Sequence, residues 1–232
     1  MKISRLFVYP VKSCAGIEVD ALSFDENGPQ GDRRFVIASP EGDFLTQREL
    51  PAMARIQPRF ERDELVLSYP ERAEIRVSMK SSSEPQRVRI WSDEVTGVDC
   101  GDNVSVWLTD ILGQTVRLFM LPDNNPRRAD SQYAPKDTAV GYADGFPLLI
   151  VTQESLDALS ELAKLPVDVR RFRPNVVIEG AASAFDEREW AALMTPEGNR
   201  LPLVKPCERC VIPTRDPDTL ERSPEVMSAL KT

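Results

Sequence analysis

The sequence predicts a mostly β chain with some helix, an α+β fold whose first half forms a small barrel or sandwich. Three observations support this prediction. Short strand-like runs dominate the first hundred residues, turn residues separate them at regular spacing, and helix-like patterns appear only later. A chain of 232 residues is long enough for one large domain or two modest ones.

The strands expected in the first half are alternating or β-branched runs. They lie at Ile3–Val8, Ile17–Phe24, Arg34–Ala38, Leu65–Ser68, Ile75–Met79 and Val88–Trp91. Turn residues such as Asn27-Gly28-Pro29 separate them. Short strands with this regular spacing favour a mostly antiparallel arrangement.

The middle of the chain changes character. A helix is expected at Asn103–Leu112, because apolar residues recur on one face there and Gly113 is a typical C-terminal stop. A strand is expected next, at Thr115–Leu121. The segment Pro122–Asp137 is polar and contains three prolines, so it is predicted to be a loop.

The second half mixes strand and helix patterns. A strand at Leu148–Val151 leads directly into a helix at Gln153–Leu165, and Thr152 is suited to cap that helix. The other elements expected are a strand at Asn175–Ile178, a short helix at Phe185–Leu193, and β-like segments at Leu203–Lys205 and Val211–Pro213.

Composition restricts the classes of function. The net charge is −8, so nucleic acid and anionic membranes are not expected as partners. No apolar run approaches the roughly 18–20 residues of a membrane span, and the N-terminus lacks the pattern of a secretory signal, so we expect a cytoplasmic protein. The chain has no histidine, which excludes Ser-His-Asp, Cys-His and His-ligated haem sites and most catalytic zinc sites.

Four cysteines are present, and Cys207 and Cys210 form a CxxC pair. Such a pair is a dithiol redox centre, half of a zinc site, or an inert buried pair. The strand-like residues after Cys210 disfavour a thioredoxin-type centre, whose thiol lies at a helix N-terminus. A four-cysteine zinc site would also need Cys14 and Cys100, which are far apart in sequence. Spacing alone therefore favours the inert pair.

Basic side chains beside predicted strand ends give a second signal. Lys12 and Ser13 follow a strand at a turn, and Arg33 begins another strand. Alternation along RRFRPN would place Arg171 and Arg173 on one face. Each of these alone is explained by solvated surface charge. Together with the thiol pair, they favour a phosphorylated ligand that also needs a sulfur contact.

Five stretches give the chain a resemblance to a known family. They are YPVKSCAG, GDRRFVIASPEGDFLTQRE, GFPLLIVTQESL, RRFRPNVVIEG and PCERCVIPTRDPDT, in that order. The chain resembles the MOSC family, specifically proteins that pair an N-terminal β-barrel domain with a MOSC domain, such as the mitochondrial amidoxime-reducing component and its bacterial relatives. The resemblance implies an N-terminal β-barrel domain over residues 1–121, packed against a MOSC β-barrel domain over residues 122–232.

The resemblance also implies a molybdenum-molybdopterin cofactor (Moco) in a positively lined cleft between the domains. Cys210 matches the family's molybdenum ligand and would be the catalytic residue, while Cys207 lies nearby. Glu208 falls where relatives often have a small hydroxyl residue that touches the cofactor. The positions that match those holding the pterin and its phosphate are Lys12, Ser13, Arg33, Arg173 and Asn175. A soft thiolate suits a redox-active metal, and a chain without histidine can supply one.

The chain ends at Thr232, where relatives usually continue through further barrel strands, so we expect a C-terminal truncation relative to the family. The CxxxxCxxC spacing of an appended ferredoxin-like domain is absent. Electrons would therefore come from an external [2Fe-2S] donor protein or from a missing ferredoxin-like domain.

Two hypotheses of function follow from the resemblance. The first is an oxidoreductase that reduces N-hydroxylated compounds, such as amidoximes or hydroxylaminopurines, at molybdenum. The second is a cofactor-binding or sulfur-carrier module without turnover, in which Cys210 carries a persulfide.

Overall fold

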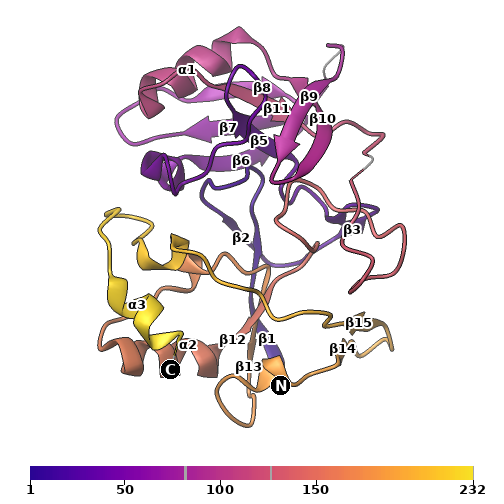
Figure 1. Cartoon of the computed structure of the whole chain (residues 1–232), viewed down its shortest axis with the longest axis vertical. Helices are drawn as coiled ribbons and strands as arrows, with labels where there is room; N and C mark the ends of the chain where they lie inside the picture. Colours follow the sequence, from indigo (N-terminus) through magenta and orange to yellow (C-terminus); the bar gives the residue numbers. More distant parts are fainter. Residues whose placement is uncertain (81–82, 126, 232) are drawn as a thin grey trace.

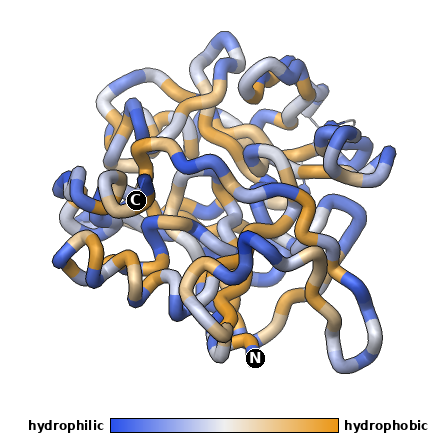
Figure 2. Tube along the Cα trace, turned by 60° about the horizontal axis from the view of Figure 1, so that its bottom comes forward, coloured by the Kyte–Doolittle hydropathy of each residue, from blue (hydrophilic) through white to orange (hydrophobic). Residues whose placement is uncertain are grey.

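The computed structural model describes residues 1–80, 83–125 and 127–231. Figure 1 shows two lobes, one above the other, joined by several crossing segments, with both termini in the lower lobe. Hydrophobic stretches run through the interior of the trace, while loops that project at its rim are largely hydrophilic (Figure 2). The predicted mostly β fold with some helix is confirmed.

The upper lobe contains two antiparallel sheets and one helix. One sheet has the order β5-β11-β10-β9, and the other has the order β6-β7-β8. The strands are β5 (Phe35–Ala38), β6 (Gln57–Glu61), β7 (Glu64–Ser68), β8 (Ile75–Ser78), β9 (Gln86–Ile90), β10 (Asp93–Asp99) and β11 (Arg117–Met120). Helix α1 (Asp102–Leu112) lies beside them, and the short 3-10 helix η1 is Pro51–Arg55.

The lower lobe is built on a mixed sheet of order β12-β13-β1-β2, in which β12 and β13 run parallel. Its strands are β1 (Lys2–Val8), β2 (Ile17–Val19), β12 (Ile150–Thr152) and β13 (Val176–Glu179). The helices of this half are α2 (Gln153–Ala163), α3 (Pro224–Ala229), η2 (Val169–Arg171), η3 (Asp186–Arg188) and η4 (Ile212–Thr214). Two hairpins complete the fold: β3 (Phe24–Asp25) with β4 (Gly28–Pro29), and β14 (Ala192–Met194) with β15 (Arg200–Pro202).

The first strand joins the N-terminus to the second half of the chain. Strand β1 pairs with β13, so the N-terminus belongs to the lower sheet. After β1 the chain enters the upper core with Val11 and Cys14 and then returns to the lower sheet in β2. It crosses again before β5 and comes back to the lower sheet between β11 and β12. The boundary at 121/122 stays a prediction, and β1 and β2 share a sheet with the second half. The crossing segments carry the basic motifs, so the topology places these motifs between the lobes.

Each lobe has its own apolar core. The upper core gathers Phe35, Ile37, Leu108 and Leu118, with further residues of β7 and η1. The lower core packs Phe7 and residues of α2, β13 and α3 together. The buried end of β1, at Phe7 and Val8, and the apolar face of α2 produce this burial.

Local signals predicted the helix ends correctly. The Thr152 hydroxyl accepts a hydrogen bond of 3.2 Å from the Ser155 amide at the start of α2. Gly113 ends α1 in the left-handed conformation, with φ of 73°. Both match the expected caps.

Several expected elements were wrong. Val211–Pro213 is not β-like, because η4 forms a 3-10 turn there around Pro213. The short helix expected at Phe185–Leu193 is a three-residue 3-10 turn that gives way to β14. The run Ile17–Phe24 is split between β2 and the short β3. Leu203–Lys205 forms no regular strand.

No helix in the described part of the chain is long and apolar enough to cross a membrane.

Candidate functional site

Three crossing segments meet between the lobes and bring most of the predicted site residues together. Ser13, Arg33 and Arg173 each lie on a different segment, and all three have left-handed backbone, with φ of 67°, 47° and 57°. Non-glycine residues adopt this conformation at a cost of about 1–3 kcal/mol each, and such residues cluster at functional sites. The surrounding structure therefore holds these three residues in place against their local preference.

The carboxylate of Asp32 organises this junction. It accepts hydrogen bonds from the Tyr9 amide at 2.8 Å, from Asn175 Nδ2 at 2.9 Å and from Arg33 Nη1 at 2.6 Å. Asn175 Oδ1 in turn accepts from Arg33 Nη1 at 3.1 Å and from the Leu149 amide at 3.2 Å. The Asn175 side-chain amide therefore makes its hydrogen bonds within the protein, and its role at the site is to position Arg33.

Tyr9 lies between two guanidinium groups. Those of Arg33 and Arg173 are each centred 4.4 Å from its ring centroid. Arg33 Nη2 also donates to the Arg173 carbonyl at 3.0 Å, and Arg173 Nη1 donates to the Cys14 carbonyl. Gly16 packs against the ring edge, where any Cβ would overlap Tyr9. An aromatic ring held between two cations lets both charges approach one site.

This junction borders a cavity of about 430 Å³ between the lobes. The upper lobe contributes η1 and the start of β6 to its lining, and the lower lobe contributes η2 and η4. Three buried donor atoms on its lining residues have no hydrogen-bond partner among the described residues: Tyr9 Oη, Arg171 Nε and Arg173 Nη2. A buried donor left unpaired costs about 1–3 kcal/mol, so these atoms indicate a ligand rich in acceptor oxygens.

Burial changes the acidity of the two groups nearest this cavity. It raises the pKa of Tyr9 to about 12, although Arg173 and Arg33 act in the opposite direction. Burial and the charge of Arg33 lower the pKa of Arg173 to about 10. At neutral pH the tyrosine is therefore a neutral donor, and Arg173 is a cation whose charge is incompletely compensated.

Lys12 forms the other end of the basic cluster. Its ammonium group is buried and donates to the Tyr142 carbonyl at 2.9 Å and to Asp144 at 2.5 Å. Burial lowers the pKa of Lys12, and the Asp144 charge opposes this shift. Asp144 also accepts from the indole of Trp91 at 3.1 Å. Ser13 is buried directly beside Lys12 in the same turn.

The four cysteines fall into two environments. Cys14 is buried and Cys100 half-buried in the upper core, and burial raises the pKa of each to about 12. Cys207 and Cys210 are both exposed. In the residues that the structure describes, no three His, Cys, Asp or Glu side chains gather to hold a metal ion. The interpretations as an inert buried pair and as a four-cysteine zinc site therefore both fail.

Arg209 connects the thiols to the rest of the site, and sequence reasoning missed it. Its guanidinium donates to the Phe172 carbonyl at 3.1 Å and lies 5.2 Å from the centre of that ring. Burial lowers the pKa of Arg209, while Cys207, Cys210 and Asp144 act electrostatically to raise it. The thiols therefore lie within electrostatic range of a cation that also interacts with the Lys12–Asp144 pair. The only signal in the sequence was its place inside the CxxC pair.

Two predicted features differ from expectation. The side chain of Glu208 is 87% exposed and lies 3.3 Å from Lys205, so it points into solvent instead of toward the cavity. Arg171 and Arg173 do not share a strand face, because η2 ends at Arg171. Arg171 instead pairs with Asp216 at 2.9 Å, while Arg173 stacks on Tyr9.

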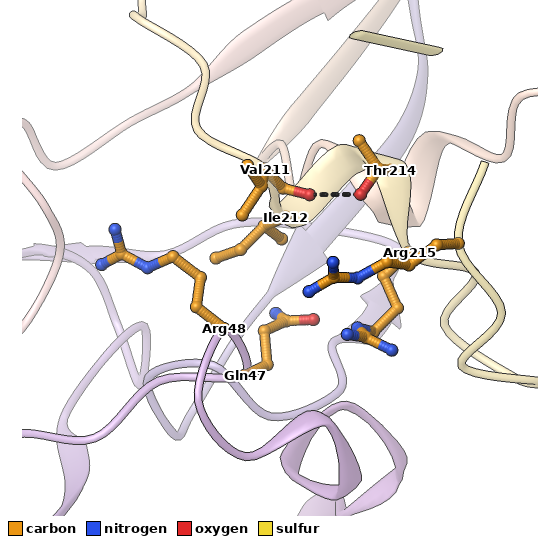
Figure 3. A pocket seen from close by; sticks show the side chains of 7 residues that line it. Gln47, Arg48, Val211, Ile212, Thr214 and Arg215 are labelled. Carbon is orange, nitrogen blue, oxygen red and sulfur yellow. Dashed lines mark hydrogen bonds between the residues drawn. The ribbon is translucent and has the colours of Figure 1, made fainter. Parts of the chain in front are cut away.

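A small hollow lies beside the cysteine segment (Figure 3). Its lining residues are Gln47, Arg48, Val211, Ile212, Thr214, Arg215 and Arg222. The turn of η4 is closed here by the Thr214 hydroxyl, which donates to the Val211 carbonyl at 2.7 Å. Three residues line both this hollow and the large cavity, so the two adjoin: Gln47, Ile212 and Arg215.

Fold and site together define a two-lobed β protein with a donor-lined cavity between its lobes. Residues 1–115 match the MOSC N-terminal beta barrel domain, and residues 137–232 match the MOSC domain. The chain therefore belongs to the family of proteins that join these two domains, to which the mitochondrial amidoxime-reducing components also belong.

Curated relatives align along most of the chain. Mitochondrial amidoxime reducing component 2 of Bos taurus is 32% identical over 228 residues, covering 94% of this chain and 67% of the relative. Mitochondrial amidoxime-reducing component 1 of Homo sapiens is 31% identical with the same coverage. Component 1 of Danio rerio is 31% identical over 241 residues, covering 99% of this chain and 74% of the relative.

Proposed function

We propose that this chain is a molybdenum-cofactor-dependent oxidoreductase that reduces N-hydroxylated compounds such as amidoximes or hydroxylaminopurines. The names of its relatives support the reaction class, since they are amidoxime-reducing components. The observation that carries the proposal is the donor-lined cavity between the lobes, which has the arginine–tyrosine stack on its lining. The exposed Cys210 directly precedes Val211, which lines the adjoining hollow.

The residues present fit a phosphorylated pterin. The unpartnered Tyr9 hydroxyl and Arg173 Nη2 are donors, and a pterin with a phosphate offers many acceptor oxygens and nitrogens. Arg173 supplies a cation that pairs with no described acidic residue, next to Arg33, which pairs with Asp32. Guanidinium groups match phosphate with paired hydrogen bonds. Cys210 offers an accessible thiol, and thiolates are suitable ligands for a redox metal. Lys12, Ser13, Arg33 and Arg173 would hold the cofactor, with Asn175 positioning Arg33.

When bound, a molybdenum cofactor supplies two electrons for the reduction of an N–O bond, with the oxygen leaving as water. The chain supplies position and charge. Cys210 would contribute one thiolate to the metal. Tyr9 holds the two guanidinium groups at fixed places, and their charge favours an anionic cofactor. Arg209 adds a cation within electrostatic range of both thiols.

An electron donor is required for this reaction. We propose that an external [2Fe-2S] protein or a ferredoxin-like domain fills that role. We also propose a cytoplasmic location, because the N-terminus lacks the pattern of a secretory signal. Glu208, which is exposed beside the thiols, would contribute at most its backbone to cofactor binding.

Turnover tests the proposal directly. Chain produced in a host that makes the cofactor is mixed with benzamidoxime and chemically reduced methyl viologen, and benzamidine is measured. The expected result is benzamidine formation that is abolished in Cys210→Ser and retained in Cys207→Ser. Chain that contains molybdenum but forms no benzamidine would refute the proposed reaction.

A further inference from the structure

The hollow beside η4 has two arginines without acidic partners on its wall. Arg215 and Arg222 form this arginine wall, while Arg48 also lines the hollow but directs its guanidinium away from it, over Trp91 (Figure 3). Neither Arg215 nor Arg222 makes an ion pair with any described acidic residue, although the chain carries 37 acidic residues and a net charge of −8. A basic cluster left uncompensated in an acidic protein indicates an anionic ligand.

The neighbouring arginines show that compensation is available nearby. Arg170 pairs with Asp168 and Asp218, and Arg171 pairs with Asp216. Arg215 lies one residue before Asp216, yet its guanidinium donates only to the Leu220 carbonyl at 2.6 Å. The acidic residues of this segment therefore neutralise the arginines of η2 and leave the arginine wall free.

The fold also holds two like charges together. Arg215 and Arg222 are joined by a β-bridge, so their side chains leave adjacent backbone. Burial and the charge of Arg222 lower the pKa of Arg215. Two cations brought together at the edge of a cavity repel each other until an anion lies between them.

Gln47 supplies an independent observation. Its side chain is 7% exposed and makes no hydrogen bond with the described residues. In Figure 3 its amide points across the hollow toward Arg215. The Gln47 carboxamide has both a donor and an acceptor, so it adds a polar group without a partner among the described residues beside the two arginines.

The hollow is small and lies close to the proposed reaction centre. Its volume of about 10 Å³ is close to that needed for one water molecule, so a larger group would lie at its mouth, where Gln47, Ile212 and Arg215 also line the large cavity. Val211, on its rim, directly follows Cys210. Arg48 stacks 4.6 Å from the centre of Trp91, whose indole donates to Asp144 beside Lys12. A molecule whose end occupies the hollow would extend toward the thiol.

We propose that the arginine wall and Gln47 bind a carboxylate group of the substrate, so that the chain prefers anionic N-hydroxylated compounds over neutral ones. This inference rests on the proposed function for the reaction itself. A carboxylate is planar, matches a guanidinium with two parallel hydrogen bonds and can accept a third from an amide.

The test compares two substrates that differ in one group. The kcat/KM of the cofactor-loaded chain is measured at low ionic strength for benzamidoxime and for 4-carboxybenzamidoxime. We expect the carboxylate compound to be preferred about tenfold, since hydrogen bonds to a charged group are strong. In Arg222→Gln and Arg215→Gln the preference falls toward one. The kcat/KM for benzamidoxime is unchanged in Arg222→Gln, because Arg222 lines the hollow and not the large cavity.

Arg200→Gln is the matched control, because it removes one charge from an exposed position on β15. It is expected to keep the preference. Equal kcat/KM for the two substrates, or a preference that survives both wall variants, overturns the inference.

Failure of the proposed function is recognised separately. If neither compound is reduced, the affinities of 4-carboxybenzamide and benzamide for the same protein are measured by calorimetry. These affinities test the carboxylate site without the reaction. Tighter binding of the carboxylate that is lost in Arg222→Gln supports the carboxylate site without the reaction. Equal binding of the two amides, or binding that is unchanged in Arg222→Gln, rejects it.

Discussion

At the scale of single residues, the site is defined by donors that the protein leaves unsatisfied. Four buried side-chain atoms lack partners among the described residues, and three of them belong to residues that line the cavity between the lobes. Asn175 and Asp32 do the opposite, since every bond they make lies within the protein. The three donors on the cavity lining have no partner within the described protein, while Asp32 and Asn175 hold Tyr9 and Arg33 in place beside them.

Tyr9→Phe tests this distinction. The variant keeps the ring between Arg33 and Arg173 and removes only the unpartnered hydroxyl. In cofactor-free protein no hydrogen bond within the protein is lost, so we expect the free energy of unfolding to increase or to fall by no more than about 1 kcal/mol. Cofactor retention after gel filtration should fall. Urea denaturation that shows a loss of 2 kcal/mol or more would mean that the hydroxyl has a partner within the protein.

Sequence reasoning identified the basic residues but not how they work together. Lys12, Arg33 and Arg173, which the sequence predicts as cofactor residues, lie in one region. Tyr9 lies in the same motif as Lys12, yet nothing in a strand-like run shows that its ring would be stacked between two arginines from distant segments. Arg209 was missed for a related reason, since its partner Phe172 is 37 positions away.

At the scale of elements, short local signals were reliable and irregular segments were not. The cap of α2 and the end of α1 follow from backbone chemistry at one or two residues. The segment after Cys210 contains β-branched residues, but Pro213 and the Thr214 hydroxyl close it into the 3-10 turn η4. Its apolar residues thereby line the hollow, an outcome that strand propensity does not reveal.

Thr152→Ala tests the importance of the cap at α2. The Thr152 hydroxyl accepts from the Ser155 amide and also donates to Glu187 at 3.0 Å. We expect a loss of about 1–2 kcal/mol in the free energy of unfolding, measured by urea denaturation. Thr115→Ala, at an exposed position, is the control and should change it by less than about 0.5 kcal/mol. Equal effects of the two variants would contradict the assigned cap.

At the scale of the whole molecule, the site exists because the chain crosses between lobes more than once. Strand β1 starts the chain in the lower sheet, and the segment after it enters the upper lobe. This crossing brings residues 9–14 beside residues 32–33 and 173–175, which no local pattern predicts. The order of the motifs along the sequence indicates the family. The path of the chain between the lobes determines which motif residues lie next to each other in the site.

The free energy of unfolding of the whole chain should fall at alkaline pH. Burial raises the pKa of Cys14 and of Cys100 from 9.0 to about 12, with Asp99 adding to the shift of Cys100. A raised pKa in the folded state means that stability is complete below pH 9 and is lost as pH rises from 9 toward 12. Burial of Lys12 acts in the opposite direction below its ordinary pKa.

Urea denaturation between pH 8 and pH 11 measures this dependence. The free energy of unfolding should decline above pH 9 in the wild type and decline less steeply in Cys14→Ala, whatever its starting stability. Cys207→Ala removes an exposed thiol and should leave the slope unchanged. A slope that is the same in all three proteins would contradict the role of the buried thiols.

The metal content of the purified chain tests the central claim most directly. Protein from a cofactor-producing host is analysed for molybdenum and for pterin, alongside Cys210→Ser and Cys207→Ser. We predict close to one molybdenum per chain in the wild type and in Cys207→Ser, and a large loss in Cys210→Ser. Sulfane sulfur on Cys210 with no molybdenum in any of the three proteins would contradict the claim and favour a sulfur carrier.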